Sequence, residues 1–129
     1  MPSSASSEAA LQLGRPVVLV VDDDNELRDI LGVLLTNEGY EMVGCPDGVD
    51  ALQKLKAGAR PSLILLDLMM PRMDGRRFRE LQRQEPALAH IPTVLMTASR
   101  NVDGIPADAV IFKPLEFDQL LNIVRHHCG

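Results

Sequence analysis

The sequence LILLDLMMP, residues 63–71, decides the fold of this chain. Its first four residues form a continuous apolar run, which is typical of a strand covered on both faces of a parallel sheet. The run ends at Asp67, and the turn-forming residues Pro71, Asp74 and Gly75 follow soon after it. Ligands of open α/β sheets bind outside the carboxyl ends of the strands. We therefore predict that Asp67 lies in a functional site.

Four more short apolar segments accompany this strand. We predict strands over residues 17–21, 40–44, 63–66, 93–96 and 109–112. Helical patterns fall between most of them, and this alternation predicts an α/β fold with a five-stranded, doubly wound parallel sheet. The second strand is the least apolar, so we expect it at an edge.

The helices follow from the spacing of apolar residues. The clearest pattern covers residues 27–35, with Asp24 or Asn25 as the N-cap and Gly39 at the end. Weaker patterns predict helices over residues 47–56 and 75–83. A last helix is predicted to carry Phe117, Leu120, Leu121 and Val124.

The link between the fourth and fifth strands, residues 98–108, is unusually short. Parallel crossovers need at least about ten to twelve residues, and Gly104 and Pro106 both disfavour a helix here. We predict at most one helical turn in this link. One face of the sheet should then be poorly covered.

Composition limits the organisation of the chain. Its 129 residues suffice for one domain, which we place at residues 16–129. We expect residues 1–15 to form a mobile leader that is neither a signal peptide nor a membrane anchor. The net charge of −5 argues against a general nucleic-acid surface, and no membrane partner is expected. Cys45 and Cys128 have no disulfide or metal spacing, which favours the cytoplasm.

Five polar side chains are predicted to meet at the carboxyl edge of the sheet: Asp22, Asp23, Asp67, Thr97 and Lys113. Converging carboxylates repel one another and so favour a bound cation, and ligands that are all oxygen favour Mg²⁺. With Lys113 and Thr97 as donors to a phosphoryl group, Asp67 is a natural covalent nucleophile, because aspartyl phosphates are an established kind of intermediate.

Together these motifs resemble the receiver domain of bacterial response regulators over residues 15–125. The resemblance rests on the acid pair after the first strand, Asp67 with Met70-Pro71 and Asp74-Gly75, Thr97-Ala98, and Lys113-Pro114. It implies a stand-alone receiver of two-component signalling with a flavodoxin-like (βα)₅ fold. Such a domain would take a phosphoryl group on Asp67 from a sensor histidine kinase or a phosphotransfer protein.

The resemblance also implies roles for the site residues. Mg²⁺ would be held by Asp23, Asp67 and the backbone carbonyl of Met69, with Asp22 acting through a bound water. Thr97 would move to hydrogen-bond the phosphoryl group, and Lys113 would pair with it. The Lys113–Pro114 bond is expected to be cis.

Two features depart from the family pattern. Thr97 and Lys113 are only 16 residues apart, so the family's fourth helix, between the fourth and fifth strands, is predicted to be truncated or missing. Val110 stands where the family has a switch aromatic. Phosphorylation chemistry should be intact, whereas output should be altered and should run through contacts with an unknown downstream protein, for which the surface near the short crossover is the candidate.

Two other interpretations stay open at this stage. The chain could be a receiver-fold binding module that works without phosphorylation, because the fourth helix and the aromatic are missing. It could also be a haloacid-dehalogenase-like phosphohydrolase with Asp22 as nucleophile, since an apolar strand precedes Asp22-Asp23-Asp24.

Two local features complete the sequence-based expectations. Arg72, Arg76, Arg77, Arg79 and Arg83 form a basic run that we interpret as a solvated helix face. Met69, two residues after Asp67, is predicted to lie over the phosphoryl group and to offer no hydrogen bond to water. With the small, uncharged Ser99, this predicts slow loss of the aspartyl phosphate.

Overall fold

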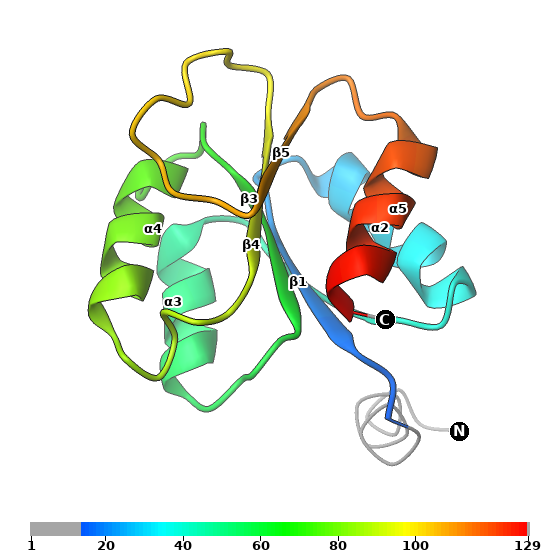
Figure 1. The fold of residues 1–129 in the computed structure, drawn as a ribbon, viewed down its shortest axis with the longest axis horizontal. Coiled ribbons are helices and arrows are strands. Elements are labelled where there is room, and N and C mark those ends of the chain that lie inside the picture. The colour runs from blue at the N-terminus through cyan, green and yellow to red at the C-terminus, as the bar shows by residue number, and fades with distance from the viewer. Residues whose placement is uncertain (1–13, 129) are drawn as a thin grey trace.

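A computed structural model describes residues 14–128 of the chain (Figure 1). The leader predicted at residues 1–15 lies almost wholly outside the described residues. No helix among residues 14–128 combines the length and the apolar character that a membrane crossing requires.

Five parallel strands form a single sheet. They are β1 (Val17–Val21), β2 (Glu41–Cys45), β3 (Leu63–Asp67), β4 (Thr93–Thr97) and β5 (Ala109–Phe112). The strand order is β2-β1-β3-β4-β5, which is the flavodoxin-like order of doubly wound sheets. The predicted fold class is therefore confirmed, and β2 lies at an edge as expected.

Two helices cover each face of the sheet (Figure 1). α2 (Asn25–Asn37) and α5 (Phe117–Cys128) lie on one face, and α3 (Gly48–Lys56) and α4 (Gly75–Gln84) lie on the other. Asp24, Asp47 and Asp74 cap α2, α3 and α4 respectively, each accepting a hydrogen bond from a backbone N–H in the first turn. These caps fix where the helices begin relative to the strand ends.

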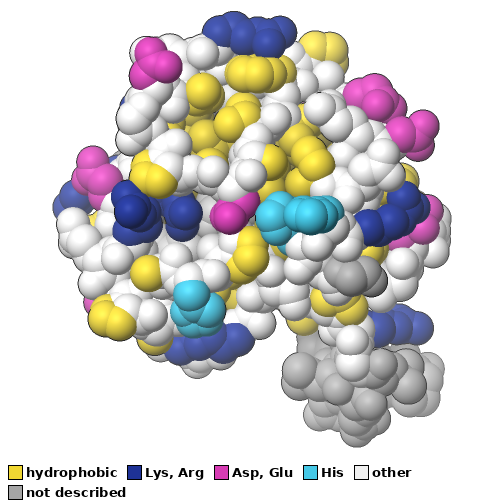
Figure 2. All heavy atoms as spheres, viewed as in Figure 1, with side chains coloured by type: hydrophobic (Ala, Val, Ile, Leu, Met, Phe, Trp, Pro, Cys, Tyr) yellow, Lys and Arg dark blue, Asp and Glu magenta, His cyan; other side chains and the backbone are white. Residues whose placement is uncertain are grey.

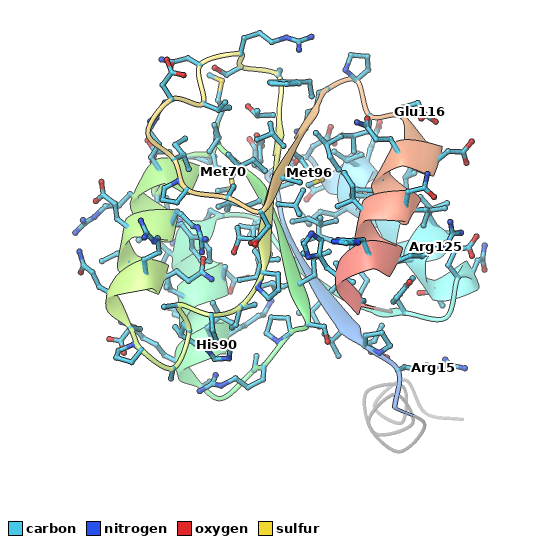
Figure 3. All side chains as sticks on the ribbon, viewed as in Figure 1. Arg15, Met70, His90, Met96, Glu116 and Arg125 are labelled. Carbon is cyan, nitrogen blue, oxygen red and sulfur yellow. The ribbon has the colours of Figure 1, made fainter. Side chains whose placement is uncertain are left out.

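The two faces of the sheet have separate apolar cores. The core beneath α2 and α5 contains Met96, whereas Met70 packs into the core on the α3 and α4 side (Figure 3). Every residue of β3 and β4 is buried, which matches their continuously apolar sequences. Phe78 of α4 is fully buried in the core on the α3 and α4 side.

β4 and β5 are joined without a helix. Residues 98–108, here called the crossover coil, contain bends and one turn, and they pass over the α4 side of the sheet (Figure 1). The predicted loss of the family's fourth helix is thus confirmed. A segment without helical hydrogen bonds must find other partners for its backbone groups.

Two arginines of α4 supply those partners. Arg76 donates to the backbone carbonyls of Asn101 and Asp103, both at 2.9 Å, and Arg79 Nε donates to the carbonyl of Pro106 at 2.8 Å. The interpretation of the arginine run as a solvated face is therefore wrong for these two residues. Arg79 is only 7% exposed, because it lies between α4, β4 and the crossover coil.

The crossover coil also covers the sheet face that was expected to be bare. Val102, Ile105 and Ala107 of the coil pack against the core on the α3 and α4 side. Leu95 of β4 is consequently fully buried, whereas Val110 of the edge strand β5 remains partly exposed on this face. The expectation of poor cover was wrong because apolar coil residues replace the helix.

Candidate functional site

The carboxyl ends of β1 and β3 bring three carboxylates together. Asp22 and Asp23 follow β1, and Asp67 is the last residue of β3. One carboxylate oxygen from each residue lies within 4.8 Å of the others. Asp22 is 0% and Asp67 is 4% exposed, whereas Asp23 is open to solvent. Two like charges are thus buried side by side, with a third at the rim.

Lys113 compensates the two buried acids. Its Nζ lies 2.6 Å from Asp22 Oδ2 and 3.4 Å from Asp67 Oδ2. Burial opposes the charge of this lysine, but the hydrogen bond and charge of Asp22 and the charge of Asp67 outweigh burial and raise the pKa of Lys113. The side chain is therefore held as an ammonium group. The Lys113–Pro114 bond is cis, as the resemblance implied.

Asp67 and Asp22 are engaged to different degrees. Asp22 accepts a hydrogen bond of 2.9 Å from the Asp24 N–H in addition to its short contact with Lys113. Asp67 has only long contacts, at 3.3 Å from the Met69 N–H and 3.4 Å from Lys113. Burial and then the charge of Asp22 raise the pKa of Asp67, and Lys113 works against that rise. Asp67 is therefore the more available carboxylate of the two.

Thr97 and Met69 lie at the same edge of the sheet. Thr97 ends β4 and is fully buried, and its Oγ1 accepts a hydrogen bond of 3.0 Å from the Ser99 N–H. Within residues 14–128 its hydroxyl makes no hydrogen bond to Asp67, although its carbonyl accepts from the Lys113 N–H at 2.9 Å. Met69, two residues after Asp67, is 66% exposed.

The loop after Asp67 is held against the end of the strand by Gly75, the first residue of α4. A Cβ at this position would lie 2.5 Å from the Asp67 carbonyl oxygen and 2.8 Å from the Leu68 Cα, so the close approach requires glycine. The Gly75 N–H donates to the Leu68 carbonyl at 3.0 Å. The Asp74-Gly75 pair thus sets the position of Asp67 relative to α4.

An ion pair that the sequence analysis missed anchors the same loop. Arg72 contacts Asp47 Oδ2 with Nε at 2.7 Å and with Nη2 at 2.6 Å, and Asp47 Oδ1 caps α3. Burial of Asp47 is outweighed by hydrogen bonds from the Asp50 N–H and Arg72, which lower the pKa of Asp47. The sequence did predict that a helix starts at Asp47. No sequence pattern, however, indicated that Asp47 would pair with Arg72, 25 residues later.

The donor set suits a hard divalent cation. Three carboxylates offer oxygen atoms within one small sphere, and the exposed Asp23 leaves the cluster open on one side. Mg²⁺ prefers such oxygen ligands and keeps part of its hydration shell. The residues present therefore fit the ion that the sequence predicted.

The geometry does not favour the phosphohydrolase interpretation. That interpretation requires Asp22 as the nucleophile, yet Asp22 is fully buried and both of its oxygens are engaged. A carboxylate that is held by a lysine and a backbone N–H is poorly placed to attack a substrate. Asp67 fits the role of nucleophile better.

Comparison with protein families agrees with this site. The model of the response regulator receiver domain family matches residues 18–125. Among curated proteins, the DNA-binding response regulator MtrA of Mycobacterium tuberculosis is 34% identical over 86% of this chain and 50% of its own length. Protein PilG of Pseudomonas aeruginosa is 28% identical over 85% of each protein. The chain thus spans about half the length of MtrA but most of PilG.

Solved structures give the same result. The receiver domain of a signal transduction histidine kinase from Syntrophus aciditrophicus has a TM-score of 0.81 and 28% identity, covering 88% of this chain and 89% of that one. The chemotaxis protein CheY4 of Vibrio cholerae has a TM-score of 0.80 and 27% identity, covering 88% and 98% respectively.

Proposed function

Because this chain belongs to the response regulator receiver family, we propose that Asp67 accepts a phosphoryl group from a histidine kinase or a phosphotransfer protein. Receiver domains of this family are signalling domains that interact with such partners. The observation that carries the proposal is the unequal engagement of the two buried acids. Lys113 and the Asp24 N–H hold Asp22 at 2.6 and 2.9 Å, whereas the Asp67 carboxylate makes no hydrogen bond shorter than 3.3 Å within residues 14–128.

Each residue of the site has its own role in phosphoryl transfer. A carboxylate oxygen of Asp67 forms the new bond to phosphorus while the bond from phosphorus to the donor's imidazole nitrogen breaks, and the electron pair leaves with the imidazole. Lys113 pairs with the phosphoryl oxygens, and the Thr97 hydroxyl turns toward them to donate a hydrogen bond. Fixed donors of this kind stabilise the charge that spreads over those oxygens.

Asp22, Asp23 and Asp67 would hold Mg²⁺, together with the Met69 carbonyl. Receiver domains generally bind Mg²⁺ at an acidic site, and the carboxylate cluster has the composition for it. When bound, the ion would neutralise charge on the phosphoryl oxygens and reduce repulsion among the carboxylates. Lys113 shares the cluster, so the position of its ammonium group sets how much negative charge is left for the ion.

The donor's histidine must reach the carboxyl edge of the sheet. α2 starts beside this edge, directly after the acid pair, and it exposes the large apolar side chains Ile30 and Val33. Exposed apolar pairs of this kind suit contact with the apolar face of a partner helix. We infer that the phosphoryl donor docks on this side of the site.

The proposal is tested with beryllofluoride, a tetrahedral stand-in for the phosphoryl group that binds aspartate carboxylates with Mg²⁺. The wild type should gain about 5 °C or more in melting temperature when both reagents are present, because ligands that bind only the folded state stabilise it. Asp67→Asn should gain nothing from the same additions. Asp29→Asn, an exposed acid on α2, should respond like the wild type.

A matching response of the wild type and Asp67→Asn would contradict the proposal. It would place the stabilising ligand elsewhere and leave a binding module that works without phosphorylation. That alternative is not favoured here, because each acid, threonine and lysine of the phosphorylation site is present at the strand ends.

Met69 should slow hydrolysis of the aspartyl phosphate. Its exposed thioether side chain follows the acid and offers an attacking water no strong hydrogen bond. We expect Met69→Asn to hydrolyse the phosphoryl group about tenfold faster, since one well-placed hydrogen bond contributes about that factor. The rate is measured by following loss of the phosphorylated mass after acetyl phosphate is removed.

Met69→Leu is the control for this prediction, because leucine keeps an apolar side chain of similar size. It should lose the phosphoryl group at the wild-type rate. An asparagine variant that is no faster than the wild type would show that Met69 does not limit access of water.

Output is proposed to run through the surface of the crossover coil. This segment follows Thr97 directly and is tied to α4 through Arg76 and Arg79. A shift of Thr97 would therefore pass to the backbone that these arginines hold.

A cytoplasmic location suits the two free cysteines, Cys45 and Cys128.

A further inference from the structure

A basic cavity lies between α4 and the crossover coil, and none of the three clustered acids is among its lining residues. It has a volume of about 380 Å³, within the size range of small-molecule sites. We call it the arginine cavity, and it is lined by Arg76, Arg79, Glu80, Arg83, Gln84, Gly104, Ile105 and Pro106. Figure 2 shows basic side chains gathered on this side of the molecule, over α4.

The positive charges in the arginine cavity are only partly compensated by the protein. Arg76 and Arg79 donate to coil carbonyls or to uncharged side chains, and Arg83 makes no hydrogen bond or ion pair within residues 14–128. Glu80 is the one carboxylate among the described lining residues, and it pairs with Arg77 at 2.9 Å. Three arginines thus line one cavity, and none of them forms an ion pair with a carboxylate of residues 14–128.

Arg79 makes this arrangement costly without a ligand. It is nearly fully buried, and buried charges are ordinarily paired. Burial lowers the pKa of Arg79, and the neighbouring Arg83 adds to that effect, while Asp108 works against it. A bound anion would add the counter-charge that Asp108 supplies only in part, and guanidinium groups match phosphate oxygens through paired hydrogen bonds.

The residues on the opposite wall of the cavity indicate which class of anion it can bind. Gly104, Ile105 and Pro106 of the crossover coil present backbone and apolar side chains rather than charge. The volume exceeds what an inorganic ion needs. We propose that the arginine cavity binds a small organic phosphate, with its phosphate against Arg76, Arg79 and Arg83 and its organic part against Ile105 and Pro106.

The test is calorimetric titration of the full chain with adenosine monophosphate and with ribose 5-phosphate. The buffer contains EDTA, so that divalent cations do not carry phosphate to the acid cluster. We expect saturable binding of at least one of these esters, weaker binding of inorganic phosphate, and no binding of adenosine or ribose. Asp67→Asn should bind as the wild type does, which separates this proposal from phosphorylation of Asp67.

Two single substitutions should change the affinity for the phosphate ester in opposite directions. Arg83→Ala should weaken binding about tenfold, because it removes a charge-assisted contact without touching the arginines that hold the coil. Glu80→Gln should tighten binding, because it removes the carboxylate that lines the cavity. Arg125→Ala, an exposed arginine on α5, is the control and should leave binding unchanged.

Three results would overturn the proposal. The first is that none of the phosphates binds, and the second is that Arg83→Ala binds as tightly as the wild type. The third is that an acidic peptide such as hexaglutamate binds while both esters do not, which would assign the cavity to a protein partner. An unaltered melting temperature of Arg83→Ala excludes loss of fold as the reason for weaker binding.

Discussion

Lys113→Ala should have opposite effects on Mg²⁺ binding and on phosphorylation. Removing the ammonium leaves Asp22 and Asp67 buried without their partner, so the protein should lose about 2–3 kcal/mol of stability when Mg²⁺ is absent. Mg²⁺ should then bind more tightly than in the wild type, because no fixed cation competes for the carboxylates. Phosphorylation by acetyl phosphate should nevertheless be much slower, because the donor to the phosphoryl oxygens is gone.

Denaturant unfolding with and without Mg²⁺ measures the first two effects, and mass spectrometry over time measures the third. Lys56→Ala is the matched control, since Lys56 is exposed on α3 and makes no contact with the acids. A Lys113→Ala protein that is as stable as the wild type in EDTA would contradict the account. It would show that the two buried acids do not depend on the lysine.

Arg79→Ala should cost about 3 kcal/mol of unfolding free energy. Arg79 donates to the Pro106 carbonyl and, through Nη1, to Gln82 Oε1 at 2.8 Å and Thr93 Oγ1 at 3.2 Å. Truncation to alanine leaves buried acceptors unsatisfied and opens a cavity, and both effects are large in protein cores. The crossover coil should also become more accessible to protease, because one of its attachments to α4 is lost.

The control for Arg79 is a neighbouring arginine. Arg77→Ala removes an exposed ion pair with Glu80 and should change stability by less than about 1 kcal/mol. Unfolding in urea measures both variants, and limited proteolysis reports on the coil. Equal stabilities of the two variants would mean that the crossover coil does not depend on Arg79.

The sequence predicted the sheet and the acid cluster because both follow from one rule. Parallel strands place their carboxyl ends at one edge, so Asp22, Asp23 and Asp67 had to approach one another once β1 and β3 were neighbours. The two ends of α2 could also be predicted from neighbouring residues. Asp24 caps the start of this helix and Gly39 follows its end, as expected. These features require only strand order and short-range patterns.

The role of the arginines could not be read in the same way. Five arginines in twelve residues looked like a solvated surface, and the periodicity of α4 alone did not show that Arg76 and Arg79 face the crossover coil. Their role could have been predicted only from the crossover coil. A helix-free crossover leaves backbone carbonyls without partners, and donors one helical turn apart on a neighbouring helix can satisfy them.

The absent helix also did not leave a bare face. Val102, Ile105 and Ala107 are too few and too irregularly spaced to suggest an element, yet they cover the core beside Leu95. Arg76 and Arg79 hold the backbone of the same coil through hydrogen bonds. Sequence patterns that assume regular elements do not describe such a segment.

The central claim is that Asp67 is the phosphoryl acceptor, and intact-protein mass spectrometry after incubation with acetyl phosphate tests it most directly. The wild type should gain the mass of one phosphoryl group when Mg²⁺ is present and little or none in EDTA. Asp67→Asn should gain none under either condition. A wild type that gains no mass with Mg²⁺, or an Asp67→Asn variant that still gains it, would contradict the account.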